Sequence, residues 1–255
     1  MQTSYRFAGR DGADLACRET GAGRPLIMLH GFIGHGGQLL EYGQLGSLAG
    51  QGVRLIMPDF RGHGRSARPH DPAAYPPDVL ADDGLALVEH LGLAEGEYDL
   101  GGYSLGARIT VRMLARGAKP GRAIVAGQGL AKVVGPQQGS TNRPVLDALV
   151  QGGPIVPGSR DAQIAYWIEK LGADPRALLN VLDSLVPTSE EELRRITVPT
   201  LVAIGEQDER SDADELAALL PEARFVRVPG DHGTAFAAPE LAAEILAFLA
   251  GGRGV

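Results

Sequence analysis

Short apolar runs that alternate with helical patterns are the feature that most narrows the fold of this 255-residue chain. Eight runs of four or five residues are rich in strand-forming side chains, and most are flanked by Gly, Pro or Asp. They are residues 4–7, 15–19, 25–29, 53–57, 98–101, 122–126, 200–204 and 224–228. Helical patterns lie between them, for example at 79–91 and 237–249. This order predicts an α/β fold, an eight-stranded, mostly parallel sheet with helices on both faces.

The first two runs depart from the parallel pattern. Only a short segment containing Arg10-Asp11-Gly12 separates them, and an Asp-Gly pair favours the positive φ of a tight hairpin turn. The chain is therefore expected to begin with an antiparallel pair of strands.

Residues 128–197 contain no convincing strand, and an irregular loop of that length is improbable in a compact domain. Apolar residues at helical spacing predict a helix over 161–171, and Asp174-Pro175 has the order of a cap followed by proline at the start of a second. Ser189 and Glu192 have the spacing of a capping box for a third. We expect a helical insertion at 128–197 in a core made of 1–127 and 198–255.

The charge and the cysteine content limit the classes of partner and cofactor that the chain is expected to bind. The formal net charge is −7 and no basic block is present, which argues against nucleic acid as a partner. Cys17 is the single cysteine, so it forms neither an internal disulfide nor a cysteine metal cluster, and we expect no metal and no cofactor. No apolar stretch reaches the ~20 residues that span a bilayer, so we expect no membrane association and a cytoplasmic location. Oligomeric state stays open.

The strongest local signal is Gly102-Tyr103-Ser104-Leu105-Gly106, which matches G-x-S-x-G between a predicted strand and a helical pattern at 107–115. Small residues two positions either side of the serine let a strand and a helix approach closely, and the serine protrudes from the sharp turn. Ser104 is therefore the candidate nucleophile.

A serine hydroxyl needs a base and an orienting acid to react at neutral pH. Asp208 follows the run at 200–204 and His232 follows the run at 224–228, so both lie in loops at the carboxyl ends of predicted strands. The order Ser, Asp, His and the shared edge of the sheet predict a catalytic triad. Asp231 is the less suitable acid, because it adjoins His232 in the chain.

A tetrahedral intermediate also requires N–H donors for its oxyanion. The backbone N–H of Leu105, directly after the nucleophile, is one candidate, and that of Phe32, in the loop after 25–29, is the other. His30 in the same loop is interpreted as structural.

Taken together, these motifs resemble the α/β-hydrolase fold family over nearly the whole chain. The matching segments are His30-Gly31-Phe32, residues 58–66, the serine motif, the turn at 205–208 and Asp231-His232. The resemblance implies that residues 59–66 form a structural turn, so Arg61 and His63 receive no catalytic role. It also implies that the insertion is a helical cap over the active site.

A serine at position 104 excludes the chemistry of haloalkane dehalogenases and epoxide hydrolases, which have an aspartate there. The leading hypothesis is a serine hydrolase that cleaves a carboxylic ester of a small or medium apolar substrate through an acyl-serine. Tyr103 and Trp167 are the expected pocket residues. A lactonase or thioesterase with the same triad is the alternative, and a small-molecule binding protein on the same scaffold is the alternative of another class.

Overall fold

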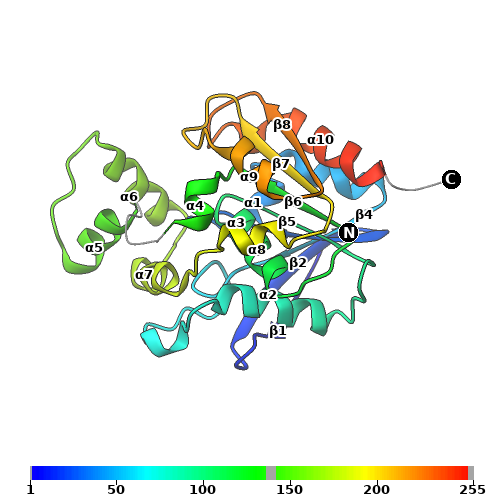
Figure 1. Cartoon of the computed structure of the whole chain (residues 1–255). Coiled ribbons are helices and arrows are strands. Elements are labelled where there is room, and N and C mark those ends of the chain that lie inside the picture. Colours follow the sequence, from blue (N-terminus) through cyan, green and yellow to red (C-terminus); the bar gives the residue numbers. More distant parts are fainter. Residues whose placement is uncertain (1, 136–141, 252–255) are drawn as a thin grey trace.

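All eight predicted strands form, and they join in one sheet (Figure 1). The computed structural model describes residues 2–135 and 142–251. The strands are β1 Thr3–Ala8, β2 Asp14–Gly21, β3 Arg24–Leu29, β4 Val53–Pro58, β5 Asp99–Tyr103, β6 Arg122–Ala126, β7 Thr200–Gly205 and β8 Ala223–Val228. Their order across the sheet is β1-β2-β4-β3-β5-β6-β7-β8.

The sheet has a short antiparallel part and a longer parallel part. β1 pairs antiparallel with β2, and β2 pairs antiparallel with β4, as the hairpin signal predicts for the start of the chain. Every other neighbouring pair, from β4 and β3 to β7 and β8, is parallel. The carboxyl ends of β3, β5, β7 and β8 therefore lie along one edge, and the loops that follow these strands meet there.

Side chains that alternate along the strands pack into two apolar layers, one on each face of the sheet. In β3, Leu26 and Met28 belong to one layer whereas Ile27 and Leu29 belong to the other, which is the period of two that a strand buried on both faces requires. The helices of the first layer are α1 Gln38–Glu41, a 3₁₀ segment at Gln44–Gln51 and α10 Pro239–Ala250. Those of the other face are α2 Val79–His90, α3 Leu105–Ala115 and α9 Ala213–Leu219. Among the described residues, no helix is long and apolar enough to cross a membrane.

The insertion between β6 and β7 contains five helices within its described residues, two more than the pattern predicts. They are α4 Leu130–Val134, α5 Arg143–Gln151, α6 Arg160–Lys170, α7 Pro175–Ser184 and α8 Glu190–Arg194. The predicted start signals are confirmed: Asp174 caps α7 through the N–H groups of Arg176 and Ala177, and Ser189 and Glu192 form a capping box at α8. Residues 136–141 of the expected insertion lie outside the described residues.

The five helices divide between two apolar clusters. Val133 of α4 and Leu193 of α8 join the layer beneath α3 and α9. By contrast, α5, α6 and α7 supply Leu146, Ile168 and Leu178 to a separate small cluster, and Figure 1 shows α5 and α6 at one end of the molecule, beyond the sheet. We propose on this packing that the cap consists of α5–α7, while α4 and α8 belong to the core.

At the junction of β5 and α3, two positions have no room for a side chain, and both are occupied by glycine. A Cβ atom on Gly102 would collide with the backbone of Gly106, and a Cβ atom on Gly106 would collide with the carbonyl oxygen of Leu29. The serine motif thus holds the strand and the helix in direct backbone contact.

We therefore expect Gly102→Ala to lower the free energy of unfolding by about 1–3 kcal/mol or more, because the backbone of α3 must shift. Gly50→Ala is the matched control, since a Cβ atom there meets nothing within 4 Å. Urea unfolding of both variants measures the difference. Equal stability of the two variants would contradict the close approach.

Candidate active site

Ser104 lies on the turn between β5 and α3 in a conformation that is rare for a residue with a side chain. Its φ is 56° and its ψ is −113°. Such backbone angles cost about 1–3 kcal/mol and persist only where the surroundings enforce them. Here the contacts of Gly102 and Gly106 enforce them, and the result is a hydroxyl that stands at the carboxyl edge of the sheet beside the first turn of α3.

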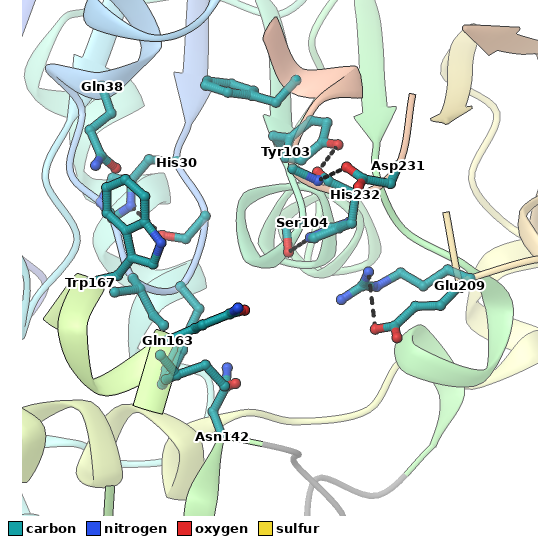
Figure 2. Close-up of a pocket in the computed structure, with 18 of the residues that line it drawn as sticks. His30, Gln38, Tyr103, Ser104, Asn142, Gln163, Trp167, Glu209, Asp231 and His232 are labelled. Atoms are coloured by element: carbon teal, nitrogen blue, oxygen red, sulfur yellow. Dashed lines mark hydrogen bonds and ion pairs between the residues drawn. The ribbon is translucent and has the colours of Figure 1, made fainter. Parts of the chain in front are cut away.

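The structure brings the three predicted triad residues together, and Figure 2 shows the contact between Ser104 and His232. The Ser104 Oγ atom lies 3.0 Å from His232 Nε2, and His232 Nδ1 lies 2.8 Å from Asp208 Oδ2. Each distance is that of a hydrogen bond. The arrangement matches a hydroxyl that donates to Nε2 and an Nδ1–H that donates to a carboxylate.

The Asp208 carboxylate is fully buried and has a second set of donors. Its Oδ1 atom accepts from the backbone N–H and from Nη1 of Arg210, each at 3.1 Å. Burial by itself raises the pKa of Asp208, but the hydrogen bond from His232 and the contacts of Arg210 outweigh burial and hold the pKa at about 2. The group is therefore a carboxylate at any pH where the protein is expected to work.

The neighbouring Asp231 is engaged differently. Its Oδ1 atom accepts from the N–H groups of Gly233 and Thr234 and from the Thr234 hydroxyl, at 2.7 to 3.0 Å. These bonds close the turn that carries His232. Asp231 therefore shapes the loop, and Asp208 is the carboxylate that contacts the imidazole.

Tyr103 has a role beyond the pocket wall that its sequence position suggests. It lines the pocket, and its hydroxyl also donates to the backbone carbonyl of His232 at 2.6 Å. Burial raises the pKa of Tyr103, so the phenol keeps the proton that it donates. Tyr103 thus fixes the backbone of the loop that presents the base, a contact between residues 129 positions apart that no sequence motif announces.

The predicted donor loop lies beside the nucleophile. A Cβ atom on Gly31 would stand 3.8 Å from the Cβ atom of Ser104, so the segment Gly31-Phe32 passes directly over the serine. Phe32 also lines the pocket. Leu105 is the first residue of α3, where backbone N–H groups have no partner inside the helix. This placement supports the two N–H groups as donors for an oxyanion.

The turn at 59–66 holds this loop in place. His63 Nε2 lies 2.7 Å from the carbonyl oxygen of Phe32, and the Asp59 carboxylate accepts from the N–H of Gly36 at 2.7 Å. Asp59 is itself held by Nη1 of Arg18, from β2, at 2.7 Å. The turn is structural, as the family resemblance implies, and it connects the donor loop to the antiparallel part of the sheet.

His30 is structural as well. Its Nε2 atom accepts from the N–H of Phe60 at 3.1 Å, and its Nδ1 atom lies 2.8 Å from the carbonyl oxygen of Gly31. Burial lowers the pKa of His30 to about 3, so the ring is neutral and Nδ1–H donates to that carbonyl. Both ring nitrogens are therefore occupied by the backbone.

Ser104 and His232 line a cavity of about 680 Å³ between the carboxyl edge of the sheet and α6. Trp167 and Ile164 supply apolar wall from α6, and Trp167 is 42% exposed. The apolar pocket expected from the sequence is thus only part of the cavity, because polar and charged side chains line the rest. They include Gln38, Asn142, Arg160, Gln163, Gln207, Glu209 and Arg210.

This combination of sheet, serine turn and loop residues is that of an α/β hydrolase. A sequence model described as "Alpha/beta hydrolase family" matches residues 26–245, and the chain belongs to this family. The chain is 39% identical over 103 residues to the AB hydrolase superfamily protein YisY of Bacillus subtilis (strain 168), across 40% of this chain and 36% of that protein.

Two further proteins are similar over nearly their full length. The non-heme haloperoxidase of Rhodococcus erythropolis is 27% identical over 274 residues, covering 94% of this chain and 97% of that protein. The solved structure of a thermophilic esterase from Thermogutta terrifontis has a TM-score of 0.77 at 24% identity, covering 97% of this chain and 98% of that chain. The structural likeness shows the fold alone, and the two names differ in activity.

The contacts of the two aspartates predict unequal effects on turnover. Asp208→Asn should lower kcat by ~10⁴-fold, because an amide stabilises the wrong tautomer of the imidazole. Asp231→Asn should cost far less, since its carboxylate contacts the turn and not the ring. Steady-state kinetics on one activated ester compares the two variants, and a larger loss in Asp231→Asn would transfer the orienting role to that residue.

The low pKa of Asp208 also predicts a pH-dependent contribution to stability. A folded-state pKa of about 2, below the ordinary 3.8, means that the ionised group stabilises the fold above pH 4 and that this stabilisation is lost as pH falls toward 2. Asp208→Asn should therefore reduce the free energy of unfolding by about 2 kcal/mol at pH 7 and by about half as much at pH 3. Urea unfolding across this range measures the gap, and a gap that stays constant would contradict the shift.

Proposed function

We propose that this protein is a serine hydrolase that cleaves a carboxylic ester through an acyl-serine intermediate. The observation that carries the proposal is the continuous contact from Ser104 to His232 to Asp208 at the floor of a cavity. Each member comes from a loop at the same edge of the sheet, and each has the neighbours that its role requires.

The reaction follows from these contacts. Ser104 Oγ attacks the ester carbonyl while His232 Nε2 takes the hydroxyl proton, and Nδ1–H stays hydrogen-bonded to Asp208. The imidazolium then gives its proton to the leaving alcohol, which leaves an acyl-serine. A water molecule, activated by the same nitrogen, attacks the acyl carbon and releases the acid and the free serine.

Charge on the carbonyl oxygen is the main barrier to each addition step. The N–H groups of Phe32 and Leu105 are the proposed donors for this oxygen, because backbone groups held in place need no reorganisation as the charge develops. His63 and Asp59 anchor the donor loop, and Tyr103 anchors the loop of the base. The site is thus fixed before the substrate arrives.

Lactones and thioesters present the same carbonyl to the same triad. The proposed cap, α5–α7, supplies the wall that would select among them, with Trp167 as its largest apolar surface. A panel of ester, lactone and thioester substrates therefore has to accompany any assay of the nucleophile.

The test of the proposal is Ser104→Ala. We expect the variant to stay folded and to lose ~10⁴- to 10⁶-fold in kcat on its best ester, and to lose covalent labelling by a fluorophosphonate. Ser47→Ala, at an exposed serine outside the cavity, is the matched control and should keep both activity and labelling. Mass mapping of the labelled peptide identifies the modified residue. A folded Ser104→Ala that keeps more than about a tenth of the activity refutes the proposal.

A further inference from the structure

One face of α6 lines the cavity and changes character along its length. Arg160, Gln163, Ile164 and Trp167 all line the cavity, and positions i, i+3, i+4 and i+7 share one face of a helix. The face runs from a guanidinium at its first residue, through an amide, to an apolar and aromatic end about 10 Å away. A molecule lying along α6 therefore meets charge at one end and apolar surface at the other.

The core supplies a second guanidinium to the cavity. Arg210 lines the cavity, and its Nη1 atom is held 3.1 Å from Asp208 Oδ1, so its side chain is anchored. The Arg210 side chain is only 16% exposed, and its buried Nε–H finds no hydrogen-bond partner within residues 2–135 and 142–251. The guanidinium is therefore held at a fixed place in the cavity wall.

Glu209 is the acidic side chain associated with both arginines. Its Oε1 atom lies 3.9 Å from Arg160 Nη2 and 3.8 Å from Arg210 Nη1, at the outer limit of an ion pair. The side chain is 66% exposed, and exposed pairs of this length stabilise little. Glu209 can turn into solvent at small cost, whereas Arg210 stays where it is. Figure 2 shows Trp167 and Glu209 on opposite sides of Ser104.

We propose that the substrate of this site carries a carboxylate on the arm that reaches Arg160 and Arg210, and an apolar group on the arm that reaches Trp167. The Glu209 carboxylate has the position between two guanidiniums that the substrate carboxylate takes. Asp231 also lines the cavity, but its carboxylate is engaged by Gly233 and Thr234. Asp208 is buried and pairs with Arg210. Glu209 is therefore the acid that can be displaced, and once it turns away the two guanidiniums favour an anionic arm over a cationic one. The inference rests on the proposed function and specifies its substrate class.

Matched esters test the charge on either arm. The first set is 4-(butanoyloxy)benzoate, its neutral benzamide and the trimethylanilinium analogue, with the charge on the alcohol side. The second set is the 4-nitrophenyl monoester of suberic acid and its primary amide, with the charge on the acyl side. We expect the carboxylate to have the higher kcat/KM in one set, with a preference that shrinks as ionic strength rises from about 0.02 to 0.5 M. The absence of a carboxylate preference in both sets overturns the proposal.

Two variants test whether the preference for the carboxylate arises at the cavity arginines. One removes a positive charge and the other removes a negative charge. Arg160→Gln should lower the ratio of kcat/KM for carboxylate over amide by about five- to tenfold, because one charged donor is lost. Glu209→Gln should raise the same ratio, because the competing carboxylate is gone. Two control variants remove the same charges at exposed positions outside the cavity. They are Arg176→Gln on α7 and Glu222→Gln just before β8, and both should leave the ratio unchanged. Equal ratios in wild type and both cavity variants overturn the proposal.

A binding measurement separates this inference from the proposed function. Calorimetry on the wild-type protein compares two acids that are not esters, 4-(butanoylamino)benzoate and the 4-nitroanilide of suberic acid, each with its neutral primary amide. Tighter binding of the acid in either pair, weakened by Arg160→Gln, supports the anionic subsite even if every ester is left intact and the proposed function fails. Equal binding of acid and amide in both pairs, alongside turnover of neutral esters, refutes the subsite and leaves the proposed function in place.

Discussion

The backbone contact between β5 and α3 is the constraint on which the site depends. Because Gly102 and Gly106 carry no side chains, the strand and the helix touch, and Ser104, the one residue between them, must turn the chain sharply. The positive φ of Ser104 is the outcome of that bend. Core packing on both faces of the sheet supplies the free energy that holds the strained turn. The same packing therefore stabilises the fold and keeps the Ser104 hydroxyl exposed.

The sequence predicts the parts of the site that depend on chain order. Asp208 and His232 were identifiable because each follows a strand of a parallel sheet, and the carboxyl ends of parallel strands share an edge. The central strands β3 to β7 are recognisable because a strand buried on both faces reads as a continuous apolar run, whereas β1 and β2 are recognised by the hairpin turn between them. Local pattern and topology are sufficient to predict the fold, the approach of Ser104, His232 and Asp208, and the position of the Gly31-Phe32 loop beside them.

Contacts that depend on side-chain direction were not predictable. The bond from Tyr103 to the His232 carbonyl joins distant segments and leaves no periodic signal. On α6, apolar spacing predicted the helix but not which face meets the cavity: Ile168 packs inside the cap, while Arg160 and Gln163 face the cavity. The sequence predicts an apolar pocket because residues 128–197 include many aromatic and aliphatic side chains, but their number does not indicate which of them face the cavity.

The turn at residues 59–66 fixes the position of the loop that contains Gly31 and Phe32. Bonds from Asp59 to Gly36 and Arg18, and from His63 to Phe32, attach the loop at separate points to a strand of the antiparallel part of the sheet. One residue added to or removed from the turn would displace these anchors by a Cα step of about 3.8 Å, more than the length of a hydrogen bond. The turn therefore sets the distance between β2, which carries no reacting group, and the backbone N–H of Phe32, the proposed oxyanion donor.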